Sequence, residues 1–199
     1  TQGVSSAASD VYKRQHLEYL TQINFYKYGL FGNISKSFID SKLDISLGIR
    51  ADEDNFSKGS KLLDNISPRI STSYALTDDR RLKWNSSVGT YFKIPTYTVL
   101  GFKDFFGDFT NRNAKYTKSN HYVTGFEYAL GNASRISIEG FIKRYGNFPI
   151  SIVDGVSLAN KGADFEVLGN ENIITNGIGK TKGIEFLFQQ KFPSRFRKN

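Results

Sequence analysis

Strict alternation of apolar and polar residues is the feature that most constrains the fold of this chain. Six short segments show it, and residues 43–50 are the clearest: odd positions carry Leu, Ile, Leu and Ile, and even positions carry Asp, Ser, Gly and Arg. Successive strand side chains point to opposite faces, so such a segment has one apolar and one polar face. Many such strands predict a sheet whose apolar face meets lipid or a core and whose other face meets water.

Composition favours a two-faced sheet over a thick core. Apolar residues make up 39% of the 199 residues, while aromatic residues reach 15%, with 17 Phe and 11 Tyr. No apolar run approaches the roughly 20 residues that a membrane helix needs, which excludes a helical membrane protein. A β-barrel wall remains possible, because its lipid-facing residues alternate with lumen residues.

Charge and cysteine content limit the kinds of binding site and partner that the chain can have. The chain carries 27 basic and 19 acidic residues, a net charge of +8, and no cysteine. Disulfides and thiolate metal sites are therefore excluded. The basic residues are scattered along the polar faces of the alternating segments, where a charged lumen explains them as well as a phosphate groove would. We expect no nucleic-acid partner and no cofactor.

The segments and their connectors predict a topology. Expected strands cover residues 25–38, 43–52, 66–76, 82–92, 122–130, 135–145 and 180–192. The connectors alternate between short and long, and the two longest cover 94–120 and 146–178. Outer-membrane barrels have short periplasmic turns and long extracellular loops. We therefore expect an all-β, antiparallel up-and-down meander of about seven strands that forms part of a transmembrane β-barrel wall.

Five segments resemble strands of TonB-dependent outer-membrane receptors, in the family's order and spacing. Residues 66–78 (ISPRISTSYALTD) are similar to an "SPR-x-S-x-S-Y-x-L-T" hairpin, and 87–95 (SVGTYFKIP) to an "S-x-G-x-Y-x-x-P" strand end. The others are 122–128 (YVTGFEY), 138–145 (IEGFIKRY) and 182–187 (KGIEFL). The resemblance covers residues 25–192 and is strongest to receptors of the Bacteroidetes type.

The resemblance implies ligand-gated, energised uptake across the bacterial outer membrane rather than an enzyme. In that family a barrel of about 22 strands encloses a plug, and an inner-membrane TonB complex pulls on an N-terminal box. Ligands include siderophores, cobalamin, glycans and peptides, and a surface lipoprotein is a further partner in addition to membrane lipid. The chain lacks Met, the plug and the box, so we expect residues 16–199 to be a barrel fragment and residues 1–15 a non-native or disordered tail.

The two longest connectors are the candidate ligand-binding loops, because exposed loops carry recognition on a rigid scaffold. The first mixes aromatic rings with carboxylates, at Tyr97, Phe102, Asp104, Phe105, Phe106, Asp108 and Phe109. The second carries Asp154, Asn160, Asp164, Phe165, Glu166 and Asn170. The alternative is that these loops pack on themselves or on each other.

No catalytic or metal site is expected. The acidic run 52–54 lacks the six or more oxygen ligands that calcium requires, so we interpret it as a solvated turn. His16 and His121 are the only histidines, and neither belongs to a triad or zinc pattern.

Two other classes remain open at this point. One is a soluble antiparallel β protein that binds carbohydrate or nucleic acid, which would need a second layer over its apolar face. The other is a small complete outer-membrane barrel of the porin or adhesin type.

Overall fold

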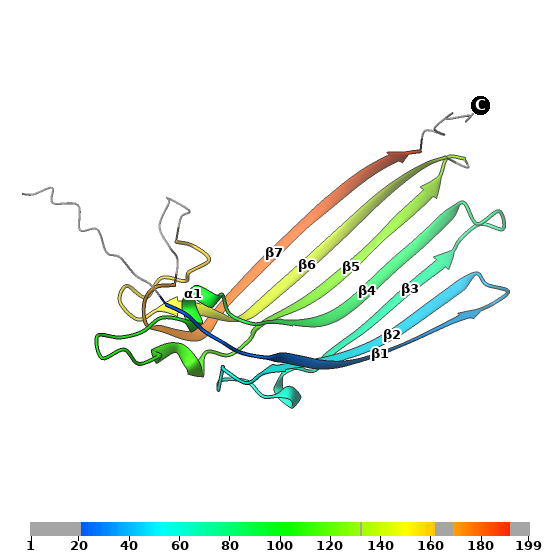
Figure 1. Ribbon diagram of the computed structural model, residues 1–199. Helices are drawn as coiled ribbons and strands as arrows, with labels where there is room; N and C mark the ends of the chain where they lie inside the picture. Colours follow the sequence, from blue (N-terminus) through cyan, green and yellow to red (C-terminus); the bar gives the residue numbers. More distant parts are fainter. Residues whose placement is uncertain (1–20, 132, 162–168, 192–199) are drawn as a thin grey trace, which may run out of the picture.

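The chain forms one antiparallel sheet of seven strands in sequence order (Figure 1). The computed structural model describes residues 21–131, 133–161 and 169–191. The strands are β1 (Lys27–Phe38), β2 (Leu43–Asp54), β3 (Ser67–Ala75), β4 (Leu82–Lys93), β5 (Thr117–Ala129), β6 (Ser134–Ser151) and β7 (Ile173–Gln190). In the described parts of the connectors, the only helices are single turns: α1 (Tyr97–Leu100) and the 3-10 turns η2 (Leu62–Asn65) and η3 (Thr110–Asn113). The predicted all-β, up-and-down meander is confirmed.

Short and long connectors lie at opposite ends of the sheet (Figure 1). The described parts of the short turns are 39–42, 76–81, 130–131 and 133. The described parts of the first, second and third long loops are 55–66, 94–116, and 152–161 with 169–172. We call these the turn end and the loop end. In the described part of the chain, no helix is long and apolar enough to cross a membrane.

The predicted strand cores are correct, but three strands extend five or more residues further toward the loop end than predicted. β5 begins at 117 rather than 122, β6 ends at 151 rather than 145, and β7 begins at 173 rather than 180. In these extensions both faces carry side chains of mixed polarity, so the sequence shows no clear alternation. The backbone ladder continues regardless, since its hydrogen bonds need no particular side chain.

One face of the sheet is apolar and bare. Partners across an antiparallel ladder share a face, and one cross-strand row on this outward face consists of Ile34, Leu47, Ile70, Val88, Tyr122 and Ile142. Each of these six side chains is at least 39% exposed. No second sheet or helix covers them within the described residues, which argues against the soluble alternative.

The opposite face, which we call the inward face, is mostly polar. A cross-strand row there consists of Ser35, Ser46, Ser71 and Ser87, and Ser35 donates a hydrogen bond to Ser46 (2.8 Å between the oxygens). Most strand carboxylates also lie on this face, where a charge avoids the roughly 2–4 kcal/mol cost of facing lipid at mid-bilayer.

The apolar band crosses the hydrogen-bonded ladder obliquely. On β1 it is centred on Gly32, between Leu30 and Ile34, and on β7 it is centred on Phe186, between Ile184 and Phe188. The row through Ile34 reaches β7 at Lys182, so the row through Gly32 corresponds to Lys180. The centre is therefore displaced by about six residues over six inter-strand steps.

This displacement gives a strand tilt. A rise of about 3.3 Å per residue and a strand spacing of about 4.8 Å convert one residue per strand into a tilt of roughly 35°. Strands of outer-membrane barrels tilt by about 35–45°. The position of the apolar residues and the strand register therefore both indicate a barrel wall that crosses a bilayer.

Candidate functional site

The three long loops pack together on a small core at the loop end. Its buried apolar residues are Phe56, Val99, Leu100, Ala114 and Ile173. They come from the first loop, the second loop and the start of β7, and the half-buried Leu158 of the third loop packs against them. At their base, the candidate loops therefore pack against each other.

Asp54, at the end of β2, joins two of these loops. Its Oδ1 accepts the backbone N–H groups of Phe56 (2.8 Å) and Ser57 (2.6 Å). Its Oδ2 accepts the hydroxyls of Ser57 (2.6 Å) and Tyr116 (2.7 Å). Tyr116 is fully buried and lies 62 residues away in the chain.

These contacts set the protonation states of both groups. Burial by itself raises the pKa of Asp54, but the donors from Ser57, Tyr116 and Phe56 outweigh it and leave the pKa below its ordinary value. Burial and the hydrogen bond to Asp54 raise the pKa of Tyr116. Asp54 is therefore an ionised, fully hydrogen-bonded carboxylate at neutral pH.

The run 52–54 is not the solvated turn that we expected. β2 extends through Asp54, and Asp52 and Asp54 are both buried. Arg50 donates to Asp52 through Nε (2.7 Å) and Nη2 (2.8 Å). Among the described residues, no group of His, Asp and Glu side chains is arranged to hold a metal ion.

Asn111 links the second and third loops. Its Nδ2 donates to the carbonyls of Val99 (2.9 Å) and Glu171 (2.8 Å), and its Oδ1 accepts the N–H of Ile173 (3.1 Å). Three of the four hydrogen bonds available to an amide side chain are therefore made. Sequence reasoning missed Asn111, because its partners lie up to 62 residues away.

Phe105 and Phe106 form an exposed aromatic tip on the second loop. The two side chains are 99% and 87% exposed, and their rings meet edge to face with centroids 5.9 Å apart. Asp104 fixes the turn beneath them by accepting the N–H groups of Phe106 (2.9 Å) and Asp108 (3.0 Å). Gly107 closes it at φ +85°, a conformation that favours glycine.

Among the other candidates in this loop, Asp108 is exposed on the same turn, whereas Phe109 and the 59% exposed Tyr97 contact rings at the base of the loop. Phe109 packs against Phe56, with ring centroids 5.1 Å apart, and Tyr97 against Phe25 at 5.4 Å. Phe102 is half-buried. The structure therefore separates the predicted set into a structural base and the tip.

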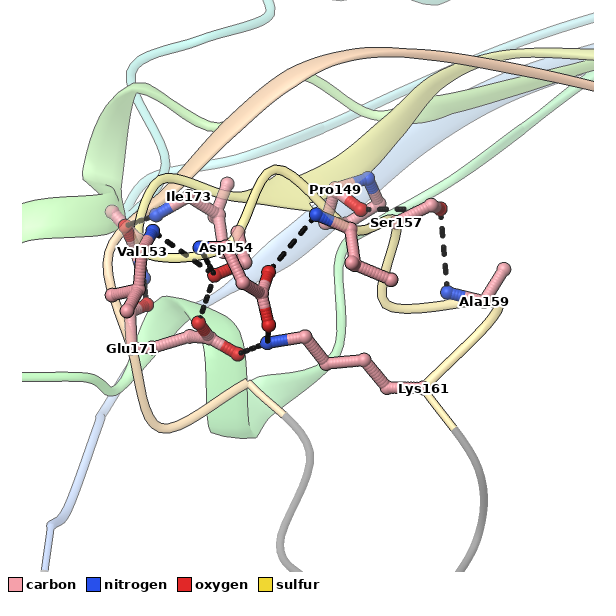
Figure 2. Close-up of polar contacts among 11 residues, drawn as sticks. Pro149, Val153, Asp154, Ser157, Ala159, Lys161, Glu171 and Ile173 are labelled. Carbon is pink, nitrogen blue, oxygen red and sulfur yellow. Dashed lines mark hydrogen bonds and ion pairs between the residues drawn. The ribbon is translucent and has the colours of Figure 1, made fainter.

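In the third loop, Asp154 belongs to an ion-pair cluster (Figure 2). Lys161 Nζ lies 2.9 Å from Asp154 Oδ2 and 2.6 Å from Glu171 Oε1. The Glu171 carboxylate, followed by Asp154, raises the pKa of Lys161, and Lys161 lowers that of Asp154. Asn160 is exposed and Asn170 half-buried, whereas the candidates Asp164, Phe165 and Glu166 lie outside the described residues.

Comparisons with known proteins agree with this geometry. The sequence model of the family "TonB dependent receptor-like, beta-barrel" matches residues 3–197. A solved structure with the same fold is the alcaligin outer-membrane receptor FauA from Bordetella pertussis, with 17% sequence identity and a TM-score of 0.52. The match covers 85% of this chain and 28% of FauA, so the chain spans just over a quarter of that receptor's length. No curated protein matches the chain.

The family match confirms several expectations from the sequence. It places the chain in the bacterial outer membrane and in a family of receptors rather than enzymes. The small complete barrel is not supported, since β1 and β7 do not pair within the described residues. The bare apolar face, the oblique band and the family match lead to one conclusion: the chain belongs to the TonB-dependent receptor β-barrel family.

Proposed function

We propose that this chain forms part of the wall and extracellular loops of a receptor that takes up a nutrient ligand, with uptake driven by the inner-membrane TonB complex. The uncovered apolar face is the observation that carries the proposal, because a sheet with this face bare in water would be unstable. The polar inward face then borders the interior through which a ligand passes.

The aromatic tip at Phe105 and Phe106 is the proposed ligand contact of this segment. Two fully exposed rings on a short, hydrogen-bonded turn offer a large apolar surface with little conformational freedom to lose on binding. Asp104 uses its carboxylate within the turn, whereas Asp108 is exposed beside the rings. Siderophores, cobalamin, glycans and peptides all carry surfaces that can pack on such rings.

Uptake assays on the full-length receptor test the proposal. Cells that express it are given a radiolabelled ferric siderophore, cyanocobalamin, an oligosaccharide mixture or a peptide mixture, with and without functional TonB. We expect one of these probes to accumulate only when both the receptor and TonB are present. Accumulation of a probe through the receptor without TonB would contradict the energised mechanism.

The double variant F105A/F106A tests the tip. For the probe that is taken up, we expect the concentration that gives half-maximal uptake to rise by about tenfold or more, as for other aromatic anchors at binding sites. Leu63, 78% exposed on the first loop, supplies a matched control, and L63A should leave uptake unchanged. Equal effects of the two variants would exclude a specific role for the tip.

A surface lipoprotein partner is a separate proposal. It predicts that a second protein co-purifies with the detergent-solubilised full-length receptor and is lost when the long loops are replaced by short turns. Purification of the receptor alone under mild detergent conditions would contradict it.

A further inference from the structure

Four cations gather on the outward face of the last three strands, near the loop end. Lys118 belongs to β5, Arg144 to β6, and Lys180 and Lys182 to β7. The register pairs Arg144 with both Asn120 and Lys180, and pairs Lys182 with Ile142. Since Ile142 belongs to the outward apolar row, these cations point away from the interior.

Their depth is the same within a few ångströms. The apolar band is centred on Thr124 in β5, near Glu139 in β6 and on Phe186 in β7, and the four cations lie about four to six residues from these centres toward the loop end. A tilted strand gains about 2.7 Å of depth per residue, which places the cations roughly 11–16 Å from mid-membrane. The apolar band of a barrel is about 25 Å tall, so the cations lie at its outer boundary.

Among the described residues, no carboxylate offsets these charges. In the described part of the chain none of the four cations forms an ion pair. The one carboxylate on the outward face of the described strands is Glu53, on distant β2, where it accepts the N–H of Leu62 (3.1 Å) and lies 3.9 Å from Lys61. By contrast, the inward cations Arg50 and Arg135 pair with Asp52 and Glu127.

We propose that Lys118, Arg144, Lys180 and Lys182 form a binding site for the phosphate groups of phosphorylated glycolipid in the outer leaflet. At this depth the acyl chains end and the headgroup phosphates begin, so the outward apolar residues and the cations meet the two parts of one lipid. Arg144 supplies a planar pair of donors for phosphate, and the lysines supply point charges. The inference rests on the outer-membrane location and is independent of transport.

Lipid retention by the full-length receptor tests this site. The receptor is placed in nanodiscs of uncharged lipid with fluorescent bis-phosphorylated lipid A or its dephosphorylated form, and bound lipid is measured by titration. Each outward cation contributes about fivefold in affinity, equivalent to about 1 kcal/mol. We expect R144Q/K180Q/K182Q to lose about a hundredfold for the phosphorylated lipid and little for the dephosphorylated one.

The inward cations provide a control with the same change of charge. R69Q/K83Q/K143Q removes one Arg and two Lys from the inward face and should bind the phosphorylated lipid like the unsubstituted receptor. Inorganic phosphate at equal phosphate concentration should not displace the lipid. Equal loss in both triple variants, equal binding of both lipids, or displacement by inorganic phosphate would overturn the proposal.

The proposal remains testable if the triple variant does not insert. Insertion is checked by the heat-modifiable gel mobility of a folded barrel, and the single variant K182Q should then show the fivefold loss. R144K/K180R/K182R, which keeps all three charges, should retain binding within a fewfold. An inserted K182Q variant with unchanged lipid affinity would also overturn the site.

Discussion

Single polar residues hold the loop end together where the apolar core is small. Asp54 and Asn111 each bind groups from segments far apart in the chain, and each makes at least three hydrogen bonds. A buried polar group is stabilising only when its partners are present. The ordered conformation of the loops therefore depends on these two side chains.

Replacing Asp54 should open the first and second loops. In D54N one oxygen becomes an NH2 group that faces donors, and about 2–3 kcal/mol of local stability should be lost. Y116F removes only one of the four hydrogen bonds and should cost about 1 kcal/mol. Hydrogen exchange of residues 55–60 in the full-length receptor measures both, and equal protection in D54N and the unsubstituted protein would contradict the role of Asp54.

The same carboxylate should make the loop end sensitive to acid. Its folded pKa is lower than the unfolded value of about 3.9, so the stabilisation is complete above that pH and is lost as the pH falls through the folded pKa. A spin label on the exposed position 58, in a cysteine-free background, should become mobile below about pH 4. In D54N the label should be mobile at neutral pH too, and a label that stays immobile until the barrel itself unfolds in acid would contradict the prediction.

Gly107 should control the direction of the aromatic tip. A Cβ at Gly107 or at Gly131 would meet no atom within 4 Å, but only Gly107 has a positive φ, of +85°. G107A should therefore cost about 1 kcal/mol in turn stability and weaken ligand uptake, whereas G131A should do neither. Comparable uptake by the two variants would show that the turn tolerates rearrangement.

Sequence reasoning identified the second loop but not the hydrogen bonds that link the loops to one another. Phe105 and Phe106 were predicted as candidates because aromatic and acidic residues cluster locally. The link from Asp54 to Tyr116 depends on which strands are neighbours, and no local pattern carries that information. The buried position of Asp54 accordingly contradicts the solvated turn expected from its composition.

At the scale of strands, the bilayer explains both the success and the errors of the sequence predictions. Within the membrane, lipid on one side and water on the other enforce alternation, so the strand cores were predictable. At and beyond the outer boundary of the apolar band, neither face meets acyl chains, and residues 117–121 and 173–179 lose the alternation while they keep their ladder. The strand extensions at the loop end could therefore not be predicted from the alternation of apolar and polar residues.

The oblique band predicts unequal losses of stability for substitutions at two positions on one ladder row. Ile34 lies about two residues from the band centre, whereas Lys182 lies about four residues from it, at the outer boundary. I34K should cost about 2–4 kcal/mol, and K182I should cost at most about 1 kcal/mol. Urea unfolding of the full-length receptor from lipid vesicles measures both, and equal costs would show that the rows run parallel to the membrane.

At the scale of the whole molecule, the sheet is a wall with two free edges. β1 pairs only with β2, and β7 only with β6, within the described residues. Unpaired strand edges cannot face hydrocarbon, because each free N–H and C=O group there costs several kcal/mol. The family to which the chain belongs supplies the reason for such edges, since further strands close its barrels.

Residues 21–191 expressed alone should therefore fail to form a stable monomer in water. The bare outward face drives association, and the edges of β1 and β7 offer templates for pairing with other copies. Detergent should cover the face but leave the edges open, so it should reduce the size of the aggregates without giving monomers. Size-exclusion chromatography with light scattering measures this outcome. A monodisperse, detergent-free monomer with native strand content would show that the apolar face does not need lipid, and the membrane placement would then be wrong.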